Sequence, residues 1–245
     1  MRRWQMGGRL DGHSSAGPLR RTRPSSGSVG FDRNARPLTT VSDYFYRWRI
    51  GRTRGDMSPA IVLTIGHSTR SIDEFIRLLA AHGVDRLVDI RTIPRSRHNP
   101  QFSRDLLSAA LRRAGIRYTH MAGLGGLRHS GPDSVNSGWR NAGFRGYADY
   151  MQTAAFGKSL ERCIDLASGG RIVLMCAEAV PWRCHRSLVA DALLVRGVPV
   201  SEITSGIRTR PHSLTPWAEV KGVAITYPSQ AASHELPPAR RARRR

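Results

Sequence analysis

The sequence contains only three cysteines in 245 residues, and this scarcity excludes a scaffold held together by disulfides. Long apolar stretches are missing too, since no run approaches the roughly 18–20 apolar residues that a membrane-spanning helix needs. The N-terminus also lacks the apolar core of a secretory signal. We therefore expect a cytoplasmic protein with reduced thiols and no membrane partner.

Lysine is nearly absent, because only two of the 39 basic residues are lysines, and the net charge of +21 is concentrated at the chain ends. Residues 1–56 carry twelve Arg and four Asp, and the last seven residues carry five Arg. Both ends lack apolar periodicity, which predicts disorder in residues 1–57 and 229–245. A mitochondrial leader, a basic arm for nucleic acid and a true start at Met57 remain open interpretations of the N-terminal part.

Residues 58–228 alternate short apolar runs with amphipathic segments, and this pattern predicts a single α/β domain. Strands are expected at residues 61–65, 86–91, 116–120 and 172–176 and in a segment that ends at 203. Helices are expected at 71–83, 103–115 and 147–167 and in a segment that ends at Gly197, followed by a hairpin within 211–228 that turns at Lys221 and Gly222. The elements predict a three-layer, Rossmann-like or rhodanese-like fold with a mostly parallel open sheet of about five strands.

Local signals place several helix features. Ser71 and Glu74 have the spacing of a capping box, and Gly83 is a typical helix end. In the second helix the spacing turns Leu106 inward together with the leucine that follows it. The third helix is expected to break near Gly157.

A loop at residues 123–146 is much longer than the usual connection of about 4–6 residues. It is rich in Gly, Ser and Asn and contains Trp139 and Arg140. We interpret it as a lid or substrate loop in which these two side chains contact the substrate.

Polar side chains follow the expected strands at their carboxyl ends, where open parallel sheets bind ligands. His67 follows the first strand, Asp89 and Arg91 end the second, and Cys176 ends the fourth. The loop after the second strand adds three basic residues, which are Arg95, Arg97 and His98. One crevice at this edge of the sheet is therefore expected to hold the site.

The richest stretch is 171–203, where a buried strand, a loop and a helix follow one another. Within eleven positions it holds six reactive or anion-binding residues, which are Cys176, Glu178, Arg183, Cys184, His185 and Arg186. Trp182, in the same loop, is expected to pack against the start of the helix.

Five segments resemble the bacterial and archaeal DUF-488 family, a domain of unknown function. They read TIGHSTRSIDEF, VDIRTIPRSRHNPQF, GIRYTHMAGLGGLR, WRNAGFRGYADYM and MCAEAVPWRCHRSLVADALLVRG. The resemblance covers residues 61–227 in the same order. It implies the fold and the motifs and leaves the chemistry open.

Cysteine nucleophile chemistry is the first hypothesis. A Cys at a strand end before a helix N-terminus is the layout of rhodanese-like and phosphatase-like proteins, because backbone N–H groups there favour a thiolate. Those loops have five residues between Cys and Arg, whereas six separate Cys176 from Arg183. Glu178 inside the loop would also repel a phosphate.

Three alternatives stay open. Glu178 is a candidate general base, or it pairs only with Arg183 or Arg186. Cys176, Glu178, Cys184 and His185, with His67 or His120 from other strands, are a candidate ligand set for zinc, but adjacent Cys and His residues rarely both reach one ion and the spacing matches no common zinc pattern. The third alternative is a non-catalytic nucleic-acid-binding module.

Taken together, we expect an enzyme acting on an anionic small molecule or nucleic acid, with no cofactor assigned and no metal ligands. The expected catalytic residues are Cys176, Glu178, Cys184, His185 and His67. The expected substrate-binding residues are Asp89, Arg91, Arg95, Arg97, His98, Arg183, Arg186, Trp139 and Arg140. Outside the site, Cys163 is expected in the core, and His82 and His212 at the surface.

Overall fold

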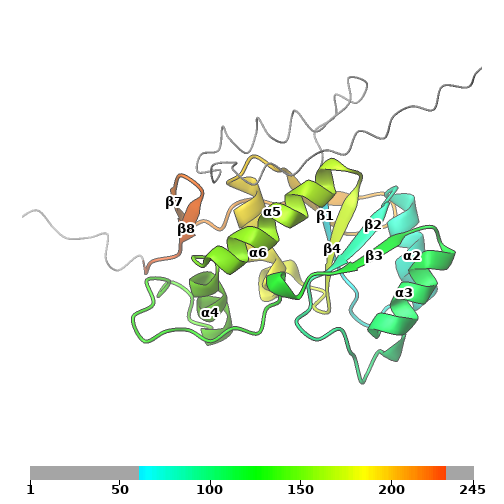
Figure 1. Cartoon of the computed structure of the whole chain (residues 1–245), viewed down its shortest axis with the longest axis horizontal. Helices are drawn as coiled ribbons and strands as arrows, with labels where there is room; N and C mark the ends of the chain where they lie inside the picture. The colour runs from blue at the N-terminus through cyan, green and yellow to red at the C-terminus, as the bar shows by residue number, and fades with distance from the viewer. Residues whose placement is uncertain (1–60, 230–245) are drawn as a thin grey trace, which may run out of the picture. The chain divides into compact units, whose positions relative to one another are not determined.

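The computed structural model describes residues 61–229, which belong to one unit of the chain (Figure 1). The predictions of disorder for residues 1–57 and for the tail beyond 229 lie outside the described residues.

The main sheet has six strands in the order β3-β2-β4-β1-β5-β6. Five of them pair in parallel, and their bounds are β1 Val62–Gly66, β2 Arg86–Asp89, β3 Arg117–His120, β4 Ile172–Cys176 and β5 Val200–Ile203. The sixth strand, β6 Thr209–Pro211, pairs antiparallel with β5 at the edge. The sequence did not predict β6, because three exposed residues that include a proline carry no strand pattern.

Helices cover both faces of the sheet, which confirms the three-layer α/β architecture (Figure 1). One face packs on α2 Ile72–Ala81 and α3 Arg104–Arg113 through a core that includes Leu63, Met175 and Phe75. The opposite face packs on α5 Ala154–Ser168 and α6 Arg186–Leu194 through a core that includes Leu174 and Leu188. Successive strand residues therefore alternate between two separate cores.

The expected helix signals are confirmed in α2. The Ser71 side chain accepts a hydrogen bond from the Glu74 backbone N–H at 3.2 Å. Gly83 follows the helix with a φ of 61°, a left-handed conformation that glycine adopts without strain.

Two helix predictions were wrong. The break expected near Gly157 lies at residues 151–153, after α4 Ala142–Tyr150, because Thr153 caps α5 by accepting from the Phe156 N–H. Leu106 is 57% exposed, since α3 turns the following leucine, Leu107, toward the sheet instead.

The C-terminal hairpin is confirmed, with β7 Glu219–Lys221 and β8 Ala224–Thr226 joined at Gly222, whose φ is 61°. Short 3₁₀ turns lie at η1 Pro100–Phe102, η2 Ala122–Leu124 and η3 Pro181–Arg183. Within residues 61–229, no helix is both long enough and apolar enough to cross a bilayer.

Candidate functional site

The carboxyl ends of β2, β4 and β1 lie side by side, because β4 is paired with both neighbours. Gly66, just before His67, pairs with Cys176, and Asp89 pairs with Met175. His67, Arg91 and Cys176 therefore lie at the same edge of the sheet.

At this edge Cys176, Cys184 and His185 form a tight cluster. Their two Sγ atoms and the His185 Nδ1 atom all lie within 4.8 Å of one another. The Nδ1 atom is 3.9 Å from the Sγ of Cys176 and 3.7 Å from the Sγ of Cys184. Both cysteines are buried, whereas His185 is half-buried.

The His185 ring is held in place from several sides. Its Nε2 atom lies 3.2 Å from the backbone carbonyl oxygen of Ile90. Since a carbonyl only accepts, this contact places a proton on Nε2, and in the neutral ring the Nδ1 lone pair then faces the sulfurs. The Tyr147 ring lies 5.1 Å away, and a Cβ on Gly126 would come within 2.4 Å of Nδ1. Only glycine at position 126 leaves room for this ring.

The two thiols of the cluster differ in acidity. A hydrogen bond from the Cys184 thiol, and then the neighbouring His185, hold the pKa of Cys176 well below its ordinary value, although burial opposes this. The same hydrogen bond, together with burial, raises the pKa of Cys184. One thiolate, on Cys176, is therefore favoured with a thiol donor beside it.

Arg186 holds the loop that joins the two cysteines. Its guanidinium donates to the backbone carbonyls of Glu178 and Ala179, the latter at 2.7 Å, and pairs with Glu202 at 2.9 Å. The side chain is 1% exposed. Arg186 therefore positions the loop from the protein interior. Its guanidinium does not point to the exterior, where it could bind a substrate anion at the cluster.

Gly66 also fixes this loop. A Cβ at Gly66 would lie 1.9 Å from the Glu178 carbonyl oxygen. The loop thus closes directly over the end of β1, and this approach requires glycine.

His67, Asp89 and Arg91 form a buried network beside the cluster. Arg91 makes a bidentate pair with Asp89 at 2.9 and 2.6 Å and donates to the Phe102 carbonyl at 2.8 Å. The Tyr118 hydroxyl donates to the same carboxylate at 2.9 Å. Asp89 is fully buried, and these hydrogen bonds together fix the orientation of the Arg91 side chain.

The neutral imidazole ring of His67 packs beside Arg91. Its Nδ1 lies 2.8 Å from the Ser68 carbonyl, its Nε2 faces Arg91 at 3.4 Å, and its ring stacks on Phe102 at 4.2 Å. Burial lowers the pKa of His67. The ring nitrogens of His67 are therefore both occupied by protein groups, although both His67 and Arg91 are close enough to interact electrostatically with Cys176.

One expected catalytic residue and several expected substrate-binding residues lie on the exterior. Glu178 is exposed, and its carboxylate accepts from the Val180 N–H at 3.0 Å. Among the described residues it forms no ion pair with Arg183 or Arg186, so the interpretation of such a pair was wrong. Five of the expected substrate-binding residues are exposed basic side chains, namely Arg95, Arg97, His98, Arg140 and Arg183. Among the described residues, no hydrogen bond or ion pair joins any of these five side chains to Cys176, Cys184 or His185.

Trp139 lies on another part of the domain. It packs against Trp217 at 5.1 Å and lines a cavity of about 500 Å³ beside α6, which neither Cys176 nor Cys184 lines. Long-range packing places it there, and the local sequence carries no signal of it.

Residues expected outside the site gave mixed outcomes. Cys163 is fully buried, as predicted, and burial raises the pKa of its thiol to about 12. His212 is not a simple surface residue, because its Nε2 lies 2.7 Å from the buried carboxylate of Asp191. His82 is half-buried, with its Nε2 lying 2.7 Å from the Ser205 carbonyl.

Comparison with known proteins places the chain by family. Residues 71–193, half of the chain, match the family model described as "Domain of unknown function DUF488". No curated protein and no solved structure matches the chain.

Proposed function

Because the chain belongs to the DUF488 family, whose description assigns no activity, we propose its function from the side chains of the site. The chain is an enzyme that acts on an anionic substrate at a zinc centre formed by Cys176, Cys184 and His185.

The spacing of the three ligand atoms carries this proposal. With Zn–S near 2.3 Å and Zn–N near 2.0–2.1 Å, the edges of a ligand tetrahedron are about 3.5–3.8 Å long. The two Nδ1–Sγ distances are 3.9 and 3.7 Å. Small side-chain movements would therefore complete three corners of the tetrahedron.

The protonation of the ligands supports the same function. Zinc binds the unprotonated nitrogen of a neutral imidazole, and the second nitrogen of such a ligand usually donates to a carbonyl or carboxylate. His185 has this arrangement, with Nε2 on the Ile90 carbonyl and Nδ1 on the sulfurs.

Cys184 and His185 are adjacent in the chain, yet both side chains point toward Cys176. Cys184 has extended backbone angles, with φ −131° and ψ 140°, whereas His185 has helical angles, with φ −55° and ψ −17°. This change of conformation turns both side chains toward Cys176.

Catalytic zinc sites have three protein ligands and leave the fourth position to water or substrate. Within residues 61–229, the cluster consists of three such ligands. Zinc at such a site makes its bound water more acidic and supplies a nucleophile for hydrolysis. The exposed Arg183, next to Cys184, adds positive charge for an anionic substrate.

Metal analysis of the purified full chain tests this function. We expect about one zinc per chain, loss of the metal in Cys184→Ser and in His185→Ala, and retention in Cys163→Ser, which changes a buried thiol outside the cluster. Hydrolysis of bis(p-nitrophenyl) phosphate, an anionic probe, should stop after chelation and return with added zinc. A folded wild-type protein that neither retains nor takes up zinc would rule the centre out.

A second candidate function is a metal-free cysteine enzyme, which the lowered pKa of Cys176 favours. In this case the Cys176 thiolate is the nucleophile and Cys184 its thiol donor. Metal-free protein would then be alkylated by iodoacetamide at Cys176 at a pH well below the usual thiol range, while Cys163 would not react. Both functions need reduced thiols, which fits the cytoplasm.

A further inference from the structure

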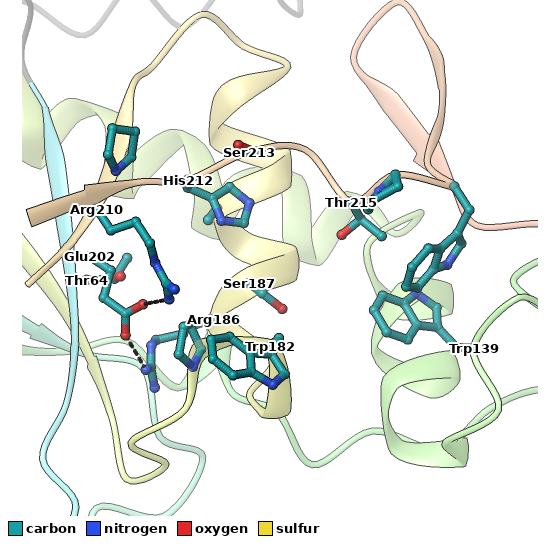
Figure 2. Close-up of a pocket in the computed structure, with 15 residues that line it drawn as sticks. Thr64, Trp139, Trp182, Arg186, Ser187, Glu202, Arg210, His212, Ser213 and Thr215 are labelled. Atoms are coloured by element: carbon teal, nitrogen blue, oxygen red, sulfur yellow. Dashed lines mark hydrogen bonds and ion pairs between the residues drawn. The ribbon is translucent and has the colours of Figure 1, made fainter. Parts of the chain in front are cut away.

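A cavity of about 500 Å³ lies between α6, the ends of β5 and β6, and the chain that follows β6 (Figure 2). Its volume lies within the roughly 300–1,000 Å³ of small-molecule sites. None of the three residues of the zinc centre lines it. The cavity is therefore a second site, although Pro181, Trp182 and Arg186 of the same loop line it.

We propose that this cavity binds a nucleotide, with its base against the tryptophans and its phosphate at Arg210. The proposal stands on the shape and charge of the cavity and does not depend on the zinc centre.

Tryptophan rings form two of the walls. Trp139 and Trp217 pack edge to face at 5.1 Å, and Tyr227 braces Trp139 at 5.5 Å. Trp182 lies on another wall and is 64% exposed, an unusual position for so large an apolar ring. Aromatic faces of this kind stack on nucleobases without selecting one base.

The other end of the cavity carries excess positive charge. Arg186 and Arg210 flank a single carboxylate, Glu202, at 2.9 and 3.0 Å (Figure 2). Two guanidinium groups against one carboxylate leave one positive charge in excess. Figure 2 shows this charged end facing across the cavity from Trp139.

Arg210 is the group free to bind an anion. Its side chain is 53% exposed, and only its Nη2 contacts Glu202. The guanidinium lies 5.3 Å from the Trp182 ring, so the anion-binding group and an aromatic face adjoin. A ligand with a planar ring and a phosphate a few bonds away matches this pair, and guanidinium binds phosphate through paired N–H donors.

Calorimetric titration of the full chain with AMP tests the proposal. We expect saturable 1:1 binding of AMP. Adenosine lacks the anion and ribose 5-phosphate lacks the base, so each should bind at least about tenfold more weakly. A short oligoadenylate distinguishes a free nucleotide from one within a strand, since a strand site would bind the oligomer more tightly than AMP.

Two variants locate the binding. Trp182→Ala and Arg210→Ala should each weaken binding of the tighter probe by about tenfold or more. The matched controls are Ile207→Ala, which removes another highly exposed apolar side chain, and Arg208→Ala, which removes an exposed arginine two residues from Arg210. Neither control should change the affinity.

The proposal is overturned if neither AMP nor the oligomer binds. It is equally overturned if ribose 5-phosphate or adenosine binds as tightly as AMP, or if both variants bind like wild type. Arg210→Lys, which keeps the charge beside Glu202, replaces Arg210→Ala if the alanine variant does not fold, and it should still weaken binding because lysine lacks the paired donors.

Discussion

The Nε2 atom of His185 lies 3.2 Å from the carbonyl oxygen of Ile90, the residue that follows strand β2. This contact holds the ring with Nδ1 toward the two thiols, and it requires a proton on Nε2 because a carbonyl only accepts. The residue after strand β2, which pairs directly with β4, thus orients the histidine beside the end of β4.

Replacement of Gly126 by alanine should damage the centre without unfolding the domain. The added Cβ would come within 2.4 Å of the His185 ring and turn the ring away from the sulfurs. We expect zinc affinity to fall by about 10- to 100-fold, the usual effect of disturbing the support of a ligand. Competition with a chromogenic chelator measures this affinity. Gly131→Ala in the same loop is the control, since no atom lies within 4 Å of its added Cβ; equal affinities in the two variants would contradict the account.

Replacement of Gly66 by alanine should destabilise the domain. The added Cβ would overlap the Glu178 carbonyl oxygen at 1.9 Å, and the loop would have to move. We expect the free energy of unfolding in urea to drop by about 1–3 kcal/mol. By contrast, Gly157→Ala in α5, where the added Cβ meets nothing within 4 Å, should stabilise by about 0.5–1 kcal/mol. A Gly66 variant as stable as wild type would show that the loop does not close over β1 in this way.

Asp191 should anchor the chain that follows β6. Its fully buried carboxylate lies 2.7 Å from the His212 Nε2 and accepts from the Thr215 hydroxyl at 2.6 Å and the Tyr227 hydroxyl at 2.9 Å. Asp191→Ala leaves these partners unpaired, including the fully buried Tyr227, and we expect a loss of about 2–4 kcal/mol in the free energy of unfolding.

Hydrogen exchange of the Asp191 variant should show local opening. Amides of β7 and β8 should lose protection before those of β1 and β4, because the anchor joins the hairpin to α6. Asp133→Ala, an exposed aspartate, is the control and should behave like wild type. Uniform loss of protection across the sheet would contradict the anchoring role.

His67 should make stability depend on pH. Burial lowers its pKa in the folded state below the ordinary value of 6.5, so the unfolded chain binds the proton more readily. The contribution is fully present above pH 6.5 and is lost as the pH falls from 6.5 toward the folded pKa, by at most about 1.4 kcal/mol per pH unit. Urea unfolding of wild type and His67→Gln measures the effect. The variant should lose less stability over this range, and parallel pH profiles would contradict the assignment.

Much of the fold could be predicted because its signals are local. Ser71 with Glu74 marks the start of α2, Gly83 marks its end, and the apolar run before Cys176 marks a buried strand. β6 could not be predicted, since its residues are exposed and pair only because β5 lies beside them. Leu106 and Leu107 were equally apolar neighbours, and only the tertiary packing of α3 decided which one is buried.

The candidate site was predictable in position and not in geometry. Strand ends placed His67, Arg91 and Cys176 at one edge, because parallel strands share their carboxyl side. The convergence of Cys184 and His185 depends on a change from extended to helical backbone between them, which residue spacing does not encode. The cavity with Trp139 requires contacts between segments far apart in the chain, such as Trp139 with Trp217.

X-ray absorption at the zinc edge of the purified full chain tests the central claim most directly. We predict two sulfur atoms at about 2.3 Å and one imidazole nitrogen at about 2.0–2.1 Å, with a lighter atom completing the four-coordinate shell. In His185→Ala, which is expected to lose the metal, this zinc spectrum should disappear. A protein that holds zinc only through nitrogen and oxygen atoms, or holds none after exposure to zinc, would contradict the account.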